Sequence, residues 1–401
     1  MTEPMNLSAV YLKKREDRRL RAGHPWVFSN EVAVERSPLA DYQAGQMVAV
    51  RSYGGDFIGT GYINPHSLIL ARIVSRTPGQ LLDDALLRSR LQRALTLRER
   101  LFAAPFYRLV FGESDGLPGL VADRYGALLV VQLLTAGMER VREEVLAALN
   151  AVVHPKTVVL RNDLASRELE GLPSYVDTAV GTAPDWVEIE EHGARFRVSP
   201  LEGQKTGWYF DQRPNRRRLL DYVRGNRVLD VCSYGGAWGV QAARAGAREV
   251  ICVDTSETAL QQVSENARLN HVEKRVSGRR GDAFEVLKGL YGEGERFGTV
   301  VLDPPAFIRR RKDMVAGVQA YRRLNRLAMR LLDADGVLIS SSCSIHLRPD
   351  KLQAILVQAA RVFQQELQIL EQGHQGPDHP VHPALPESNY LKVFFTRPLV
   401  G

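Results

Sequence analysis

The stretch NRVLDVCSYGGAWGV (226–240) decides the fold that we expect for this sequence. An apolar run of strand character ends near Asp230, small and polar residues form a turn, and a segment of helical period follows. Similar strand–helix units continue along the chain and indicate a parallel sheet with helices on both faces. The two last strands are close enough in sequence to make an antiparallel edge, so a seven-stranded, mostly parallel Rossmann-like sheet is expected. The expected strands are 226–232, 249–254, one near 276, 299–303, 336–342, 367–372 and 390–396, and the expected helices are 236–245, 257–270, one after 282, 314–333 and 350–364.

Two further regions precede this α/β domain. Residues 1–75 contain short β-branched stretches at 32–38, 47–64 and 68–76 with a Gly54–Gly55 turn, which predict a small β-barrel. Residues 76–185 begin with an amphipathic helix over 80–104 and continue with turn-rich, strand-like and helical segments, so a mixed α/β domain is expected. The third domain spans 186–401 and opens with a β-hairpin.

Composition favours a cytoplasmic protein with a polyanionic partner. The net charge is +7, and the basic residues gather in KKREDRRLR (13–21), which contains Lys13 and Lys14, and in IRRRK (308–312). Such clusters are also ordinary solvated faces. No apolar run approaches the roughly 20 residues that span a bilayer, and the N-terminus lacks a signal core. Three cysteines fit no disulfide framework, and two histidines in GPDHPVHPALPE predict no metal site.

Acidic residues end three successive strands at the carboxyl edge of the expected sheet, where ligands bind in such folds. Asp230 precedes the turn, Asp254 is placed for ribose hydroxyls, and Asp282 is placed for an adenine amino group. The turn lacks dinucleotide-type glycine spacing, and an acid before it disfavours phosphate but suits a cationic ligand. A single Asp there is usually a helix cap, but three around one glycine turn favour S-adenosylmethionine. The expected turn residues of this site are Ser233, Tyr234, Gly235 and Gly236.

The loop after the fourth strand, LDPPAFIRRRK (302–312), is the expected substrate side of the site. Asp303 ends the strand, and the two prolines that follow stiffen the loop. Phe307 could stack on a base while neighbouring arginines hold phosphates, which is the usual combination for single-stranded nucleic acid. A sharp turn is the alternative explanation for the two prolines. The expected substrate contacts in this loop are Pro304, Pro305, Phe307, Arg309, Arg310 and Arg311.

Cys343 lies in VLISSSCSIHL (337–347), at the carboxyl end of the fifth strand and beside the loop of Asp303. A free cysteine is commonly a buried apolar residue, and that explanation suits Cys252 inside its strand, while Cys232 lines the cofactor side. Cys343 stands where a base would be presented. A thiolate that adds to pyrimidine C6 makes C5 nucleophilic toward a methyl sulfonium, so Cys343 is the candidate nucleophile. Cationic neighbours would favour its ionisation.

Several long motifs in this order carry a family resemblance that runs almost from end to end. The chain resembles the bacterial PUA-linked 23S rRNA large-subunit methyltransferases that make 5-methylcytidine. The motifs are GHPWVFSNEV (23–32), FGESDGLPGLVADRYG (111–126), GQKTGWYFDQRPNR (203–216), LDVCSYGGAWG, VDTSETAL, VLDPPAF, SSSCS and DHPV…PESNYLKVFF.

The resemblance implies a class I methyltransferase domain that uses S-adenosylmethionine, an N-terminal PUA-like barrel that binds RNA, and 23S rRNA as substrate. It implies Cys343 as nucleophile and Asp303 as the acid near the reacting base. Phe210 and Asp211 of GQKTGWYFDQR would contact the cofactor. VLDPPAF contains no cysteine, so release cannot depend on a second thiol there. Related architecture is compatible with a homodimer, but no residue pattern here demands one.

Two other functions stay open at this point. Asp-Pro-Pro-aromatic loops also occur in enzymes that methylate base nitrogens, such as those of guanine, and these need no thiol. A degenerate RNA-binding protein without activity is the second, but the intact acids and glycines of the expected cofactor turn argue against it. DNA is a less favoured substrate because the PUA-like barrel suits RNA.

Overall fold

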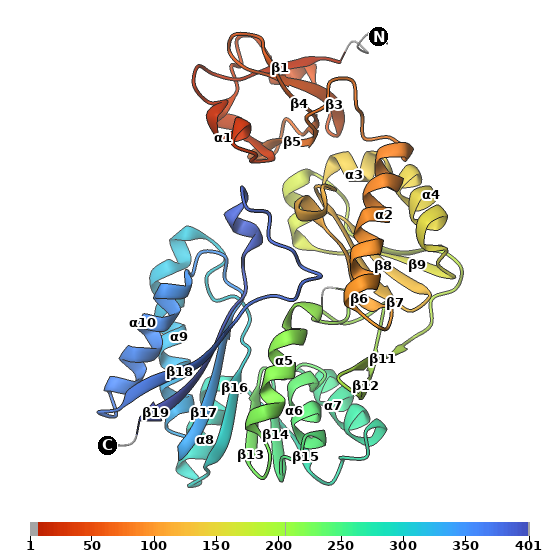
Figure 1. Ribbon diagram of the computed structural model, residues 1–401. Coiled ribbons are helices and arrows are strands. Elements are labelled where there is room, and N and C mark those ends of the chain that lie inside the picture. The colour runs from red at the N-terminus through yellow and green to blue at the C-terminus, as the bar shows by residue number, and fades with distance from the viewer. Residues whose placement is uncertain (1–6, 205, 400–401) are drawn as a thin grey trace. The chain divides into compact units, whose positions relative to one another are not determined.

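The computed structural model describes residues 7–204 and 206–399 and divides into two compact units (Figure 1). We call them unit 1 and unit 2. Both are discontinuous in sequence, because the chain passes from one to the other and back. Unit 1 comprises Met1–Val187, Val198–Phe210 and Pro377–Ser388, and unit 2 comprises Glu188–Arg197, Asp211–Gly376 and Asn389–Gly401.

Unit 2 is built on a seven-stranded sheet of order β15-β14-β13-β16-β17-β19-β18. The first five strands in this order are parallel, and β19 is antiparallel to both β17 and β18. This topology confirms the predicted mostly parallel sheet with an antiparallel edge. The strands are β13 (Arg227–Val231), β14 (Glu249–Asp254), β15 (Val276–Arg280), β16 (Phe297–Leu302), β17 (Leu332–Ser342), β18 (Glu366–Gly373) and β19 (Lys392–Leu399).

Two helical layers cover this sheet. One contains α8, α9 and α10, whose apolar faces join the central strands in the main core. The other contains α5, α6 and α7. Central strands such as β16 are buried along their whole length, as expected where helices cover both faces. The helices are α5 (Arg213–Leu219), α6 (Ala237–Arg244), α7 (Glu257–Leu269), α8 (Ala283–Gly292), α9 (Met314–Met329) and α10 (Pro349–Arg361).

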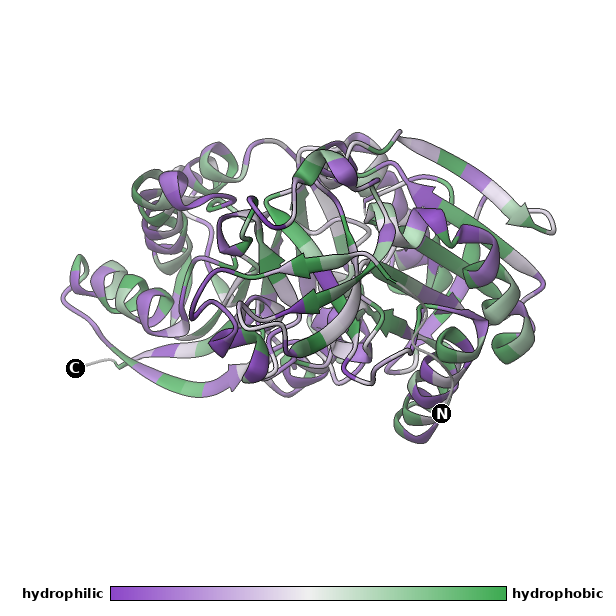
Figure 2. Cartoon of the chain, turned by 90° about the horizontal axis from the view of Figure 1, so that it is seen from above, coloured by the Kyte–Doolittle hydropathy of each residue, from purple (hydrophilic) through white to green (hydrophobic). Residues whose placement is uncertain are grey.

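Unit 1 contains two five-stranded sheets, each with its own apolar core. The N-terminal sheet has the order β1-β3-β4-β5-β2, and the second has the order β10-β9-β8-β7-β6. Figure 2 shows hydrophobic residues concentrated in the strands, while the helices carry hydrophobic and hydrophilic residues in alternation. The strands are β1 (Ala9–Tyr11), β2 (Trp26–Phe28), β3 (Gln46–Arg51), β4 (Phe57–Ile63), β5 (Ile69–Ser75), β6 (Phe106–Phe111), β7 (Leu120–Tyr125), β8 (Leu128–Leu133), β9 (Thr157–Asn162) and β10 (Tyr175–Val180), and the helices are α1 (Arg18–Arg21), α2 (Asp84–Leu101), α3 (Ala136–Arg140) and α4 (Arg142–Val153).

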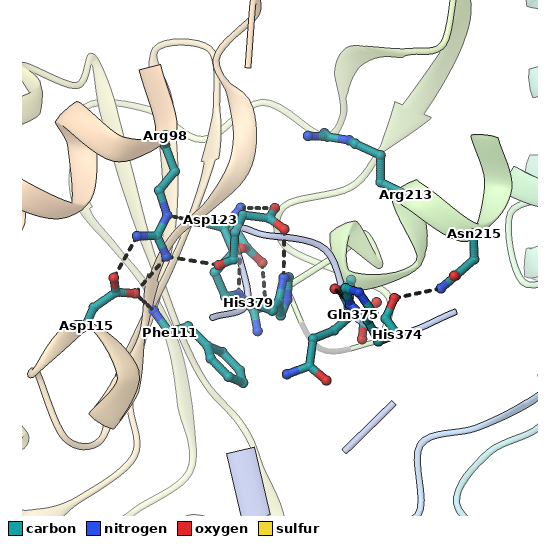
Figure 3. Close-up of polar contacts among 12 residues, drawn as sticks. Arg98, Phe111, Asp115, Asp123, Arg213, Asn215, His374, Gln375 and His379 are labelled. Carbon is teal, nitrogen blue, oxygen red and sulfur yellow. Dashed lines mark hydrogen bonds and ion pairs between the residues drawn. The ribbon is translucent and has the colours of Figure 1, made fainter. Parts of the chain in front are cut away.

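The segment Pro377–Ser388 is tied into unit 1 by buried polar contacts (Figure 3). The guanidinium of Arg98 donates to both carboxylate oxygens of Asp115, at 2.6 and 2.7 Å, and to the carbonyl of Asp378 at 3.0 Å. The backbone N–H of Arg108 donates to the Asp378 carboxylate at 3.0 Å. The ring of His379 packs against that of Phe111, 5.1 Å away, and its Nδ1 lies 3.0 Å from the Asp378 carboxylate.

The hairpin β11 (Val187–Glu191) and β12 (Ala194–Val198) contributes a buried carboxylate to unit 2. Glu191 accepts hydrogen bonds from the Arg216 guanidinium of α5 and from the Gln241 amide of α6. Arg213 lies 3.3 Å from the same carboxylate. These cations hold the pKa of Glu191 far below its usual value, although burial alone would raise it.

Some local predictions were wrong. Residues 32–38 form a turn and no strand, because the N–H groups of Arg36 and Ser37 both donate to Ala33. The helix expected over 314–333 ends at Met329, and β17 already begins at Leu332. The short strands β1, β2, β6 and β10 had not been recognised at all. Each of these strands forms because it pairs with a neighbouring strand, and its own residues show little of the alternation of apolar and polar side chains.

Replacing Arg216 with methionine should destabilise unit 2 by about 3–5 kcal/mol, because Glu191 would then be a buried charge without its main partner. Urea unfolding followed by circular dichroism measures the effect. The matched control is Arg217→Met, one residue away, whose exposed pair with Asp221 should contribute about 0–1 kcal/mol. Equal midpoints for the two variants would contradict the importance of the buried pair.

Candidate active site

The turn between β13 and α6 has an unusual backbone. Cys232 and Tyr234 have φ of +64° and +47°, and Gly236 has φ of +77°. Non-glycine residues in this region each cost about 1–3 kcal/mol and persist where the surroundings hold them. The N–H of Tyr234 donates to the Asp254 carboxylate at 2.9 Å, which helps to hold the turn. At Gly236 a Cβ would come within 3.1 Å of a Val263 methyl group, and the positive φ would add strain, so both space and conformation favour glycine.

Asp230 lies at the end of β13 and is fully buried. One carboxylate oxygen accepts the N–H of Gly239 in α6 at 2.9 Å. The other, Oδ1, has no hydrogen-bond partner among the residues that the structure describes. Burial raises the pKa of Asp230 to about 7, and the negative charges of Asp303 and Asp254 add to the rise.

These groups fit a ligand that brings hydrogen-bond donors. Two buried polar atoms around the turn, Asp230 Oδ1 and Ser233 Oγ, lack a partner within the described chain, which is costly unless a ligand or water supplies one. Gly235 and Gly236 leave the turn without side chains. One Asp254 oxygen accepts the N–H of Tyr234, and the other accepts the N–H of Ser256 at 3.0 Å. Each oxygen keeps a second lone pair that a ligand could use.

Asp282 has the helix-cap role, and its cofactor role stays a prediction. It is exposed at the N-cap of α8, where its Oδ1 accepts the N–H groups of Phe284 and Glu285. The helix-cap explanation is therefore correct for one oxygen. Its Oδ2 has no hydrogen bond with the described residues and stays a candidate ligand contact.

Asp303 follows β16 and accepts three hydrogen bonds from three different elements. The Gln212 amide donates at 2.8 Å, the Trp238 indole of α6 at 3.0 Å and the Ser341 hydroxyl of β17 at 2.6 Å. Burial raises the pKa of this carboxyl, while the three donors act in the opposite direction. Asp303 therefore links α6, which follows the candidate cofactor turn, to the strand that carries the candidate nucleophile.

The loop after Asp303 has an exposed part and a packed part. Pro304 is buried and Pro305 is exposed. The ring of Phe307 is half-buried and lies 4.8 Å from that of Tyr321 in α9, so part of its surface is used in packing. The arginines of this loop, Arg309, Arg310 and Arg311, are exposed.

The three cysteines have different surroundings. Burial and nearby carboxylates raise the pKa of Cys232 and of Cys252, so both thiols stay protonated near neutrality. Cys343 follows the last residue of β17 and is only half-buried. The nearest elements hold it firmly: Ser342 Oγ donates to the Tyr321 hydroxyl at 2.8 Å, and Ser344 Oγ lies 2.9 Å from the same oxygen.

The remaining predicted residues lie in both units. Asp211 is buried in unit 2 and accepts the Tyr390 hydroxyl at 2.6 Å. Phe210 is buried in unit 1, where its ring lies 5.4 Å from that of Tyr125. Lys13 and Lys14 are exposed in unit 1, and Lys13 donates to the carbonyl of Asn30 at 2.9 Å.

Sequence reasoning missed three residues that organise this site: Gln212, Trp238 and Ser341, the donors to Asp303. All three lie within motifs already noted, but only their side-chain directions identify them. A signal was available for Trp238, since an indole N–H beside a glycine turn needs an acceptor.

Neither a metal site nor a membrane span emerges from the described residues. Within 7–204 and 206–399, no three histidine, cysteine or acidic side chains gather as metal ligands would. Over the same residues, every helix is too short or too polar to cross a membrane.

Comparison with family models gives two matches. Residues 10–76 match a PUA-like domain, and residues 167–392, more than half of the chain, match an S-adenosylmethionine-dependent methyltransferase. These matches confirm the predicted N-terminal PUA-like domain, the predicted methyltransferase fold and the predicted cofactor.

Similar curated proteins cover the whole length. The ribosomal RNA large subunit methyltransferase I of Cronobacter sakazakii is 37% identical over 395 residues, which are 97% of this chain and 99% of that protein. The Escherichia coli K12 protein of the same name is 36% identical over 398 residues, covering 98% and 100%.

Solved structures share the fold. SMU.776, described as a methyltransferase and crystallised with SAH, has a TM-score of 0.84 at 21% identity and covers 98% of this chain and 100% of its own. A protein from Streptococcus mutans described as SAM-dependent has a TM-score of 0.83 with the same identity and coverage.

The raised pKa of Asp230 predicts a pH-dependent stability difference. The carboxyl titrates near 3.8 in the unfolded chain and near 7 in the folded one, so the folded state binds the extra proton between these values. Stability therefore falls as pH rises through this window. Asp230→Asn removes the dependence, so its free energy of unfolding relative to the wild type should increase between pH 5 and pH 8.

Urea unfolding midpoints of both proteins across this range measure the effect. The control is Asp335→Asn, whose carboxyl is exposed on β17, and its difference from the wild type should stay constant. Parallel pH profiles for wild type and Asp230→Asn would show that Asp230 is ionised in the folded protein throughout.

Proposed function

The chain belongs to the S-adenosylmethionine-dependent methyltransferase family, and we propose that its substrate is 23S rRNA, in which it forms 5-methylcytidine. The first part of the proposal is supported by the relatives from Cronobacter sakazakii and Escherichia coli, which are named ribosomal RNA large subunit methyltransferases and cover nearly the whole chain. The observation that carries the choice of base is the position of Cys343.

Cys343 combines access with the right neighbours. It is half-buried at the carboxyl end of β17, two residues after Ser341, which donates to Asp303. The other two thiols lie among carboxylates that keep them protonated. A reactive thiol belongs in a partly exposed place away from carboxylates. Cys232 is half-buried like Cys343, but the carboxylates around it disfavour its thiolate, and Cys252 is fully buried, so Cys343 is the thiol that we propose as nucleophile.

The proposed chemistry is covalent catalysis on a pyrimidine ring. The Cys343 thiolate forms a bond from Sγ to C6, and the electrons of the C5–C6 double bond make C5 nucleophilic. When bound, S-adenosylmethionine would supply the methyl group that C5 takes up, and its sulfonium S–CH3 bond would break to leave S-adenosylhomocysteine. The C5 proton then leaves to a base, the Sγ–C6 bond breaks, and the double bond and the thiolate are restored. Asp303, held by its three donors, or a water is the candidate base.

The residues of the turn would hold the cofactor. Asp230 and Ser233 each offer a buried acceptor, Asp254 offers its remaining lone pairs, and Asp282 offers its second oxygen. Tyr234, Gly235, Gly236 and Asp211 complete the set proposed in unit 2. Phe210, which the family resemblance implies as a further contact, belongs to unit 1.

The substrate surface is proposed from charge and exposure. The PUA-like domain, with exposed Lys13 and Lys14, would contact RNA, and the loop of Pro304, Pro305 and Phe307 would receive the target base. The target base must leave any stack to reach Cys343. An rRNA substrate places the protein in the cytoplasm. A homodimer stays a prediction from the family resemblance.

The deciding experiment compares Cys343→Ala with the wild type. Both proteins are incubated with unmethylated large-subunit rRNA and labelled S-adenosylmethionine, and the product nucleosides are identified by mass. The wild type should yield 5-methylcytidine, and the variant none, because it lacks the thiolate that activates C5. Binding of S-adenosylhomocysteine, measured by calorimetry, should be the same in both.

The control is Cys252→Ala, since this thiol is buried within β14 and should be dispensable for methylation. A Cys343→Ala variant that methylates as well as the wild type would overturn the cytosine-C5 proposal. A methylated guanine product would then favour transfer to a base nitrogen by the Asp303 loop. Absence of both cofactor binding and methylation in the wild type would favour a non-catalytic RNA-binding protein.

The three exposed arginines of the loop give a further prediction. Replacing Arg309, Arg310 and Arg311 together with alanine should weaken rRNA binding and flatten its dependence on salt, because fewer counterions are released from phosphates. Filter binding at several salt concentrations measures both effects. An unchanged salt slope would remove this loop from the RNA surface.

A further inference from the structure

A buried lysine lies beside the candidate nucleophile. Lys392 is the first residue of β19 and pairs with Ser342, the last residue of β17. Because β19 runs antiparallel to β17, its start lies at the same edge of the sheet as the end of β17. Cys343 follows Ser342 directly, so the antiparallel strand brings a cation to the thiol. A parallel strand would have brought its own carboxyl end there instead.

The surroundings of Lys392 are poor in negative charge. Its side chain is only 4% exposed, and its ammonium donates to two neutral carbonyls, those of Ser344 at 2.6 Å and Tyr390 at 2.7 Å. Within the described residues, no carboxylate forms an ion pair with it. An ammonium has three N–H groups, so two carbonyls do not use its full capacity. Burying an ammonium without a counter-charge costs free energy, and a nearby anion would lower that cost.

The thiolate of Cys343 is the anion that the geometry offers. Burial lowers the pKa of Lys392 to about 8, and a negative charge on Cys343 raises it again. The effect is mutual, because an ammonium that is stabilised by a thiolate stabilises that thiolate equally.

Other groups around Cys343 do not replace this cation. Tyr321 of α9 presents its hydroxyl to Ser342 and Ser344, and burial raises its pKa, as does a charge on Cys343, so it stays a neutral phenol. Asp303 approaches through Ser341 and would oppose ionisation of the thiol. Lys392 is thus a cationic group that interacts electrostatically with Cys343 from the neighbouring strand.

We propose that Lys392 is a positioning residue that stabilises the Cys343 thiolate and fixes the 342–344 turn through the carbonyl of Ser344. The inference deepens the proposed function, on which it rests for the catalytic role of the thiol. The thiol proton leaves to solvent, and Lys392 keeps its own proton. Lys392 does not touch the base, and it acts only through Cys343.

Alkylation of Cys343 as a function of pH tests the proposal without any methylation assay. Full-length wild type and Lys392→Met are treated with iodoacetamide between pH 6 and pH 10, and the rate at Cys343 is followed by peptide mass spectrometry. The midpoint should rise by about one pH unit or more in Lys392→Met, since removal of a nearby opposite charge disfavours the thiolate. Lys392→Arg should largely restore the wild-type midpoint.

The matched control is Lys351→Met, which removes an exposed lysine from α10 and should leave the midpoint unchanged. Thermal unfolding and binding of S-adenosylhomocysteine identify variants that have lost their fold. If Lys392→Met does not fold, the pH midpoint of Lys392→Arg is compared with that of the wild type instead. An unchanged midpoint in a folded Lys392→Met protein, or a midpoint in Lys392→Arg that is raised as in Lys392→Met, would overturn the proposal.

Methylation gives a second readout. The rate of Lys392→Met relative to wild type should recover as pH rises, because its thiol then ionises without help. A deficit that is the same at every pH would assign Lys392 a purely structural role and overturn the proposal. The proposed function fails separately, if Cys343→Ala methylates rRNA as well as the wild type. The alkylation experiment then still reports whether Lys392 stabilises the Cys343 thiolate.

Discussion

One half-buried but strongly desolvated carboxylate, that of Asp303, needs hydrogen-bond donors and thereby connects the parts of the candidate site. Asp303 takes its donors from the turn before α5, from α6 and from β17. Two of these donors belong to elements of the candidate site: Trp238 to the helix that follows the proposed cofactor turn, and Ser341 to the strand that ends at the candidate nucleophile. A buried charge is costly unless it is fully satisfied, so displacing any of these elements would leave Asp303 short of a partner. The requirement thus holds cofactor turn and thiol in register.

The carboxyl edge of the sheet is electrostatically divided. Around β13 and β14, acids crowd together, raise the pKa of Asp230 to about 7 and keep the neighbouring thiols neutral. Around β17 and β19, a lysine takes the place of the acids. Cys232 and Cys252 therefore stay protonated on the β13–β14 side of the edge, while Cys343 on the β17–β19 side is the candidate nucleophile. The difference arises from strand direction, because only an antiparallel strand could start at this edge with Lys392.

Much of unit 2 was predictable from sequence, because regular alternation of strands and helices has few topological solutions. The strand ends followed from where apolar runs stop, so the positions of Asp230, Asp254, Asp303 and Cys343 along the sheet edge could be stated in advance. The cofactor followed from the same pattern. Domain boundaries and the role of each site residue stay predictions.

What could not be predicted depends on long-range contacts. Short strands such as β1 and β2 lack a pattern of their own and exist because partners were available. The turn at 32–38 has the alternation of a strand, but local hydrogen bonds to Ala33 prevail. Lys392 read as an ordinary strand residue, since nothing local reveals that its ammonium ends beside a thiol 49 positions earlier in the chain.

The tie between Asp378 and unit 1 has a consequence for synthesis on the ribosome. Arg98 and Arg108 must wait for a partner that is translated 280 and 270 residues later. At about 5–20 residues per second, that interval is roughly 15–55 s. During it, the Arg98 guanidinium and the backbone N–H of Arg108 lack the contacts that Asp378 later supplies. The last tenth of the chain therefore finishes a unit that the first half began, and a protein that stops before residue 377 would lack the closing contacts of both its units.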